Sequence, residues 1–202
     1  MLLTRLELQH VDEMWLKWDS MLILGLDPGL LRTGYACLEV DPTAAFASPL
    51  LVEAGVFRLK REQSIHLRLV ELERDLLELF GRYRPTAACV ESLFSHVVHP
   101  RTAILMAHAR GVILLAVARA ELKLLELPPA EVKKSVTGNG RATKEQVQHA
   151  VSAMLGLSGP PDPPDVADAM AVALCGSRRL VDPFEARVVA GPSRGRSSPL
   201  AP

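Results

Sequence analysis

The segment LILGLDPG, at residues 22–29, decides the fold of this chain. Residues 22–26 carry no polar side chain, which is typical of a strand that is buried on both faces of a sheet. Pro28 keeps Asp27 in the extended conformation, so this acid stands at the end of the strand. Burying an ionised carboxylate costs free energy unless it is paired or bound to a cation. Asp27 therefore indicates a site at the edge of the sheet.

The rest of the chain predicts a mixed sheet. Two further strands are expected at 35–40 and 50–59, beside the first strand in an antiparallel meander. Apolar residues then recur at helical spacing over 65–79, in a helix that Gly81 is expected to end. The later elements are strands at 87–91 and 123–127, and helices at 102–119, from Pro128-Pro129, at 144–155 and at 165–178. This order indicates an α/β fold, with parallel strands after the meander and helices on both faces of the sheet.

Length and composition indicate one domain with two distinct ends. A chain of 202 residues, 49% of them hydrophobic, is long enough for a single domain with a large core. Residues 1–20 hold both tryptophans and directly precede Met21, so we expect an N-terminal extension or a mis-called start. The domain itself is expected at 21–180. Residues 181–202 are rich in proline and arginine and are expected to form a disordered tail.

Charge and cysteine content limit the partners and the compartment. The 23 basic and 23 acidic residues cancel, which taken alone argues against a nucleic-acid-binding protein. Residues 92–150, however, carry eight bases against four acids, so the middle of the chain is basic. The three isolated cysteines fit reduced thiols, and no apolar run is long enough for a bilayer. We expect a cytoplasmic protein with no membrane partner.

Three more acids interrupt apolar runs as Asp27 does. Glu91 ends the strand at 87–91, whereas Asp165 and Asp168 lie three residues apart and share one face of a helix. If the strands that end in Asp27 and Glu91 are parallel neighbours, both acids emerge at the same edge of the sheet. Clustered carboxylates raise one another's pKa, and Mg²⁺ relieves this because it prefers oxygen ligands. Two such ions can promote phosphodiester hydrolysis by an activated water.

Each acid taken alone has an ordinary structural explanation. The sequence Asp27-Pro-Gly is more often a turn, and Glu91 can cap a strand or pair with an arginine. Asp165 is favourable near a helix N-terminus because of the helix dipole. Asp168 lies within an apolar helix and is harder to explain without a ligand. The four acids together favour a metal site.

Seven segments between Met21 and Arg179 resemble the RuvC family of Holliday-junction resolvases. They are ILGLDPG (23–29), TGY (33–35), VESLF (90–94), HARG (108–111), EVKK (131–134), TGNGRATKEQVQH (137–149) and DVADAMA (165–171). The resemblance implies a ribonuclease H-like fold and the activity of a crossover junction endodeoxyribonuclease. It also implies two Mg²⁺ per subunit, with Mn²⁺ as a substitute, bound by four catalytic acids: Asp27, Glu91, Asp165 and Asp168.

The resemblance further implies a homodimer that cuts two strands of four-way junction DNA symmetrically. Such an enzyme works with the RuvA and RuvB branch-migration proteins in recombination and DNA repair. Phe94 is expected to stack on an unpaired base, although an aromatic residue that follows Leu93 is equally a core anchor. Lys133 and Lys144 match basic positions that contact DNA in the family, and Arg141 extends that contact.

One segment departs from the family. HVVHPR at 96–101 replaces a stretch that is usually polar, which affects the DNA contacts of this loop and not the metal site. His96 and His99 resemble a zinc-binding pair but have no third ligand nearby. Three other functions stay open: a related ribonuclease H-like nuclease acting on structured RNA or single strands, an actin-like ATPase, and a junction-binding module without nuclease activity. The ATPase fold needs two such halves, for which 202 residues are too few.

Overall fold

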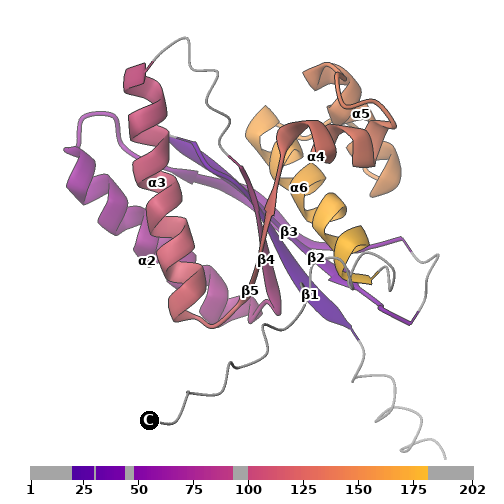
Figure 1. Cartoon of the computed structure of the whole chain (residues 1–202), viewed down its shortest axis with the longest axis horizontal. Helices are drawn as coiled ribbons and strands as arrows, with labels where there is room; N and C mark the ends of the chain where they lie inside the picture. Colours follow the sequence, from indigo (N-terminus) through magenta and orange to yellow (C-terminus); the bar gives the residue numbers. More distant parts are fainter. Residues whose placement is uncertain (1–19, 30, 44–47, 93–99, 182–202) are drawn as a thin grey trace, which may run out of the picture.

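Five strands form one mixed sheet in the computed structural model, which describes residues 20–29, 31–43, 48–92 and 100–181. The strands are β1 (Met21–Asp27), β2 (Arg32–Val40), β3 (Leu50–Arg58), β4 (Ala87–Glu91) and β5 (Lys123–Leu127). Their order across the sheet is β3-β2-β1-β4-β5 (Figure 1). The first three strands are antiparallel neighbours, whereas β1, β4 and β5 run parallel. The predicted meander followed by parallel strands is confirmed.

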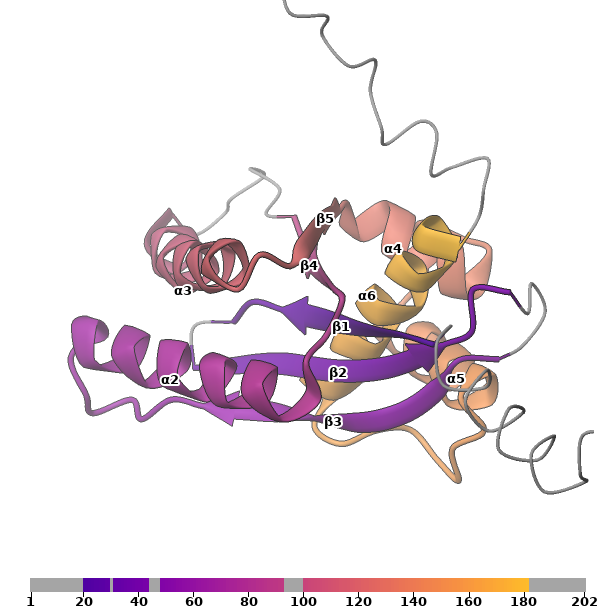
Figure 2. The same cartoon turned by 90° about the horizontal axis from the view of Figure 1, so that it is seen from below.

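Helices cover both faces of the sheet, as predicted. One face carries α2 (Ile65–Tyr83) and α3 (Pro100–Arg119), and the other carries α4 (Pro129–Thr137), α5 (Lys144–Met154) and α6 (Pro164–Val181) (Figure 2). The side chains of β1 alternate between these two layers. Ile23 packs in the core cluster of α6, whereas Leu24 and Leu26 pack in the cluster of α2 and α3. Burial on both faces explains why this strand is apolar up to its final acid.

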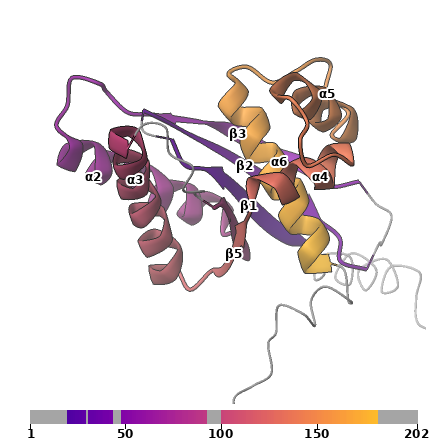
Figure 3. The ribbon, with the colours of Figure 1, turned by 45° about the horizontal axis from the view of Figure 1, so that its top comes forward.

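Glycines let α6 lie directly against β1 and β2 (Figure 3). A Cβ atom built on Gly25 would lie 2.3 Å from the backbone oxygen of Ala169. A Cβ atom on Gly34 would lie 2.1 Å from the backbone oxygen of Asp165. No side chain fits at such distances, so the two glycines set how closely α6 approaches the sheet. The same contacts fix the helix turn that carries Asp165 and Asp168.

The C-terminus of α2 corrects one prediction. Gly81 does not end the helix, which continues to Tyr83. The helix stops at Arg84, which has a left-handed conformation with φ 50°, and whose N–H donates to the backbone oxygen of Phe80 at 2.8 Å. Pro85 follows, and a proline disfavours helical conformation in the residue before it. The proline therefore ends α2, and the glycine is tolerated inside it.

The predicted N-terminus of α5 is confirmed. The Thr143 hydroxyl accepts a hydrogen bond from the Gln146 N–H at 3.3 Å, and the Thr143 N–H donates to Gln146 Oε1 at 2.9 Å. This reciprocal pair is a capping box, and it satisfies two backbone donors that the helix cannot pair internally. The cap fixes the first turn of α5 and, with it, the position of Lys144.

The predictions for both ends, and for the loop after β4, concern residues that the structure does not describe. The residues in question are nearly all of the extension at 1–20 and of the tail at 181–202, together with Phe94, His96 and His99. Among the helices of the described ranges, none has the length and apolar character that a membrane span requires.

Candidate active site

Asp27 and Glu91 lie next to each other at one edge of the sheet. β1 and β4 are parallel neighbours in which Leu26 is paired with Val90, so the following residue of each strand is the acid. The condition under which the two acids emerge at the same edge of the sheet is therefore met. The pairing brings both carboxylates to the carboxyl edge of the parallel strands, where α/β proteins commonly form their binding sites.

A pocket of about 270 Å³ opens at this edge, and we call it the carboxylate pocket. Strands β1 and β4 and helices α3 to α6 contribute to its wall. Its charged lining residues are three acids and two lysines: Asp27, Glu91, Asp168, Lys133 and Lys144. The structure thus brings together three of the four predicted catalytic acids and two of the predicted DNA contacts.

Burial and crowding hold a proton on this group of acids. Burial, followed by the charges of Glu91 and Asp168, raises the pKa of Asp27 from 3.8 to about 8. Burial and Asp168 also raise the pKa of Glu91, whereas its hydrogen bond with Asp27 and the two pocket lysines lower that pKa. Burial and the neighbouring charges thus favour the protonated form of Asp27, whose carboxyl group shares a hydrogen bond with Glu91.

Asp168 is neutralised by a lysine. Lys144 Nζ donates to Asp168 Oδ2 at 3.2 Å, and the charge of Asp168 raises the pKa of Lys144. The two residues come from α5 and α6, so this ion pair joins the helices across the mouth of the carboxylate pocket. Lys144, which the sequence predicted to contact DNA, is thus paired with Asp168 in this structure.

Asp165 lies beside the carboxylate pocket and is not among the described residues that line it. Its Oδ2 atom is 3.8 Å from Nη1 of Arg32, at the start of β2. The charge of Asp165 raises the pKa of Asp27 less than burial, Glu91 or Asp168 does. The fourth predicted acid is therefore near the other three but is held outward by an arginine.

The donor set of the pocket fits a divalent cation. Carboxylate oxygens are the ligands that Mg²⁺ prefers, and a cation would offset the two effects that raise the pKa of Asp27, which are its burial and then the charges of Glu91 and Asp168. Across the part of the chain that the structure describes, no three acidic, histidine or cysteine side chains have the spacing of a formed metal site.

Arg141 does not join the two pocket lysines. It is exposed in the loop between α4 and α5, and its backbone N–H donates to Asn139 Oδ1 at 3.0 Å. The pocket wall does not include it. Of the predicted DNA contacts in the described residues, Lys133 and Lys144 face the acids and Arg141 faces solvent.

Arg32 is a charged residue of this edge that sequence reasoning missed. The antiparallel register pairs Asp27 with Gly34, which places Arg32 just beyond the end of β1. The available signal was a basic residue soon after Asp27-Pro-Gly, in a segment expected to return to the sheet. That signal does not reveal its partner, because Asp165 comes from the far end of the chain.

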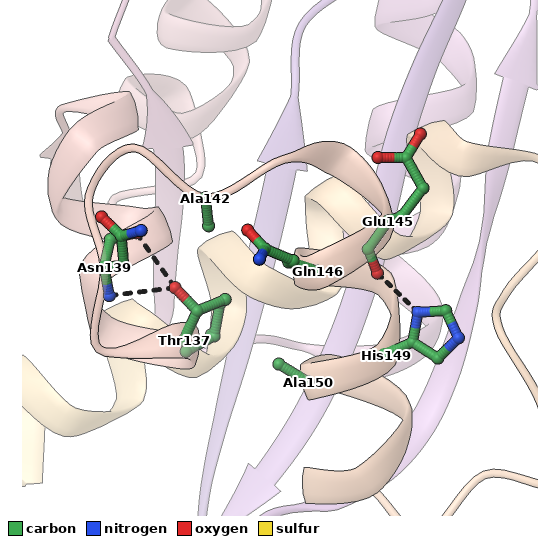
Figure 4. A pocket seen from close by; sticks show the side chains of 8 residues that line it. Thr137, Asn139, Ala142, Glu145, Gln146, His149 and Ala150 are labelled. Atoms are coloured by element: carbon green, nitrogen blue, oxygen red, sulfur yellow. Dashed lines mark hydrogen bonds between the residues drawn. The ribbon is translucent and has the colours of Figure 1, made fainter.

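A second cavity, of about 490 Å³, lies between the end of α4 and α5 (Figure 4). Its polar side chains make local hydrogen bonds. The Thr137 hydroxyl accepts from the Asn139 N–H at 3.1 Å and so ties the connecting loop to the end of α4, whereas a hydrogen bond of 2.7 Å joins His149 Nδ1 to the backbone oxygen of Glu145 within α5. None of the four predicted acids lines this cavity.

The raised pKa of Asp27 predicts how the stability of the metal-free protein depends on pH. Between about pH 4 and about pH 8 the folded protein keeps a proton that the unfolded chain releases, because the pKa of Asp27 changes from about 8 to 3.8 on unfolding. Stability from this proton is fully present below the unfolded pKa and is lost as the pH rises through the folded pKa. We expect the free energy of unfolding of the wild type, relative to Asp27→Asn, to fall over this range. Urea denaturation in EDTA measures it, and a difference that does not change with pH would contradict the assignment.

Comparisons with known proteins agree with the sequence motifs. The family model described as "Crossover junction endodeoxyribonuclease RuvC" matches residues 23–176. The crossover junction endodeoxyribonuclease RuvC of Rhodopirellula baltica is 46% identical over 163 residues, which cover 81% of this chain and 89% of that protein. A structure of Thermus thermophilus RuvC superposes with a TM-score of 0.71 at 29% identity, covering 79% of this chain and 95% of the other. T. thermophilus RuvC in complex with a Holliday junction substrate gives a TM-score of 0.70 at 26% identity, with the same coverage.

Proposed function

The chain belongs to the RuvC family of crossover junction endodeoxyribonucleases, and from this premise we propose that it is a Mg²⁺-dependent nuclease that resolves Holliday junctions. The observation that carries the proposal is the carboxylate pocket. Three acids from three separate segments meet there beside two lysines. The fold match to a RuvC structure in complex with a Holliday junction supports the choice of substrate.

The acids of the pocket are proposed to hold two Mg²⁺ ions, which Mn²⁺ can replace. Asp27, Glu91 and Asp168 provide the oxygens that already face one cavity, and Asp165 completes the set from the rim. Bound in pairs, such ions activate a water and stabilise the leaving oxygen of a phosphodiester.

The pocket residues have separate tasks in this proposal. Asp27 must lose the proton that it shares with Glu91 before its carboxylate can bind a cation. Lys133 lowers the pKa of Glu91 and so helps to keep Glu91 ionised. Lys144 Nζ exchanges its hydrogen bond with Asp168 for one with a phosphate oxygen of the DNA. In the free protein, a proton and Lys144 neutralise the acids. In the complex, the bound cations would neutralise them, and Lys144 would pair with the DNA.

A homodimer would present two such pockets to the two equivalent strands of a four-way junction. Two apolar side chains on α3 support this assembly, since Ile104 is 59% exposed and Leu115 is 47% exposed. Their spacing of three helical turns places them on one face, which a second subunit can cover. Symmetric hydrolysis by the dimer, together with the RuvA and RuvB branch-migration proteins, would serve recombination and DNA repair.

Metal removal tests the proposed chemistry. The purified chain should cut a synthetic four-way junction at two symmetric positions in Mg²⁺, should be inactive in EDTA, and should regain activity with Mg²⁺ or Mn²⁺. Mapping both nicks on labelled strands measures this. Each proposed Mg²⁺ site that is filled at one hundred times its Kd should also stabilise the fold by about 2.7 kcal/mol.

The same assay separates the competing functions. Duplex DNA, single strands and structured RNA serve as parallel substrates under identical ionic conditions. Preferential cleavage of RNA or of single strands would replace the junction assignment by a related nuclease. Tight junction binding without cleavage in any metal would indicate a binding module instead.

A further inference from the structure

Arg32 occupies a position at the same edge of the sheet as the acids. β2 begins at Arg32, and its register with β1 carries it past Asp27. Lys133 and Lys144 come from α4 and α5 and line the carboxylate pocket together with the acids. Arg32 comes from β2 and is not among the described residues that line this pocket.

The arginine is engaged by one of the four acids. Nη1 of Arg32 is 3.8 Å from Oδ2 of Asp165, while the two side chains are 52% and 31% exposed. Asp165 is close enough to influence the pKa of Asp27, yet it is not among the described residues that line the pocket. Its backbone is fixed against Gly34, so only the side chain can change its direction. The guanidinium group and a cation in the pocket thus compete for the same carboxylate.

We propose that Arg32 is a positioning residue that holds Asp165 outside the carboxylate pocket until a phosphate of the DNA backbone takes over its guanidinium group. This inference rests on the function proposed above. A guanidinium group binds phosphate with the same paired geometry that it uses for carboxylate, and half of this side chain is accessible to solvent. Asp165, once released, turns toward the cation. DNA binding and metal binding then strengthen each other, as any two ligands do when both favour the same state of one element.

Metal binding to the free protein provides the first test. Mn²⁺ titrated calorimetrically into Arg32→Met should bind about two- to fivefold more tightly than to the wild type, which is the range that a half-exposed ion pair can supply. Arg32→Lys, which keeps the charge, should bind Mn²⁺ nearly as the wild type does. Arg58→Met is the matched control, because Arg58 is paired with Arg32 across β2 and β3 and is also exposed. This control should leave the Mn²⁺ affinity unchanged.

A double-mutant cycle shows whether Arg32 acts through Asp165. In an Asp165→Asn background, Arg32→Met should no longer alter the Mn²⁺ affinity. The inference is overturned if Arg32→Met binds Mn²⁺ no more tightly than the wild type, or if the gain persists without the Asp165 carboxylate. Thermal unfolding of each variant excludes a change of fold as the cause.

Coupling between DNA and metal gives a second readout. The affinity for a fluorescent four-way junction, measured by anisotropy in EDTA and in Ca²⁺, yields the factor by which the cation tightens DNA binding. This factor should be about two- to fivefold smaller for Arg32→Met than for the wild type or for Arg58→Met. An equal factor in all three proteins would refute the exchange of partners. Absence of junction cleavage by the wild type would instead remove the proposed function, and the Mn²⁺ titrations would still decide the role of Arg32.

Discussion

Asp27→Asn should lower the rate of junction cleavage at least about 10³-fold while leaving junction binding intact, because the change removes one oxygen ligand and its charge from the proposed metal site. Asp27 lines the carboxylate pocket, and burial, followed by the charges of Glu91 and Asp168, raises its pKa to about 8. The amide keeps nearly the same shape and can still donate a hydrogen bond to Glu91. Single-turnover cleavage of a labelled four-way junction in Mg²⁺ measures the rate, and a gel-shift assay measures binding.

Asp75→Asn is the matched control for this substitution. Asp75 lies on α2, which belongs to the core cluster on the other face of the sheet from α6, and it pairs with Arg74. The control should cleave at the rate of the wild type. Cleavage by Asp27→Asn at that same rate would remove Asp27 from the catalytic residues and with it the two-metal proposal.

Gly25→Ala should destabilise the fold by about 3 kcal/mol or more, the upper range of overpacking, because the added methyl group meets backbone atoms that cannot rotate away. The new carbon would lie 2.3 Å from the Ala169 oxygen and 2.5 Å from the Ala173 nitrogen. α6 would have to lift from the sheet, and Asp168 would move with it. Urea denaturation followed by circular dichroism measures the loss as a lower free energy of unfolding.

Gly81→Ala serves as the control for the glycine substitution. Gly81 is an exposed residue inside α2, and a Cβ built on it meets no atom within 4 Å beyond its own helix and its chain neighbours. Alanine there should raise the free energy of unfolding by about 0.5–1 kcal/mol, because glycine weakens a helix interior. Equal effects at both positions would show that contact with α6 does not explain the requirement at Gly25.

Local signals in the sequence predicted most of the fold. The apolar run before Asp27 and the capping box at Thr143 each depend on a few neighbouring residues, and the structure contains both. The predicted end of α2 at Gly81 was wrong, because a helix can tolerate a glycine but rarely continues through the residue before a proline. The preferences of single residues do not show which of two such stop signals will end the helix.

The sequence predicted which acids form the candidate site, but it did not predict how their side chains are arranged or which residues they pair with. The sequence predicted that Asp27 and Glu91 would be adjacent if their strands were parallel neighbours, and the pairing of β1 with β4 meets that condition. The partners of Asp165 and Asp168 could not be predicted, since Arg32 and Lys144 reach them only through the packing of α6 and α5. Such contacts depend on how α5 and α6 are positioned on the sheet relative to each other, and no short stretch of sequence predicts that position.

The parallel pairing of β1 with β4 has a consequence for when the protein can act on DNA. Asp27, Glu91 and Asp168 come from distant parts of the chain, and they meet only after this pairing has formed and α6 has docked. Contacts of long sequence separation form late and are lost together when a domain unfolds. A partly unfolded copy of this chain would therefore hold scattered acids and no carboxylate pocket, so that the proposed cation site forms only together with the complete domain.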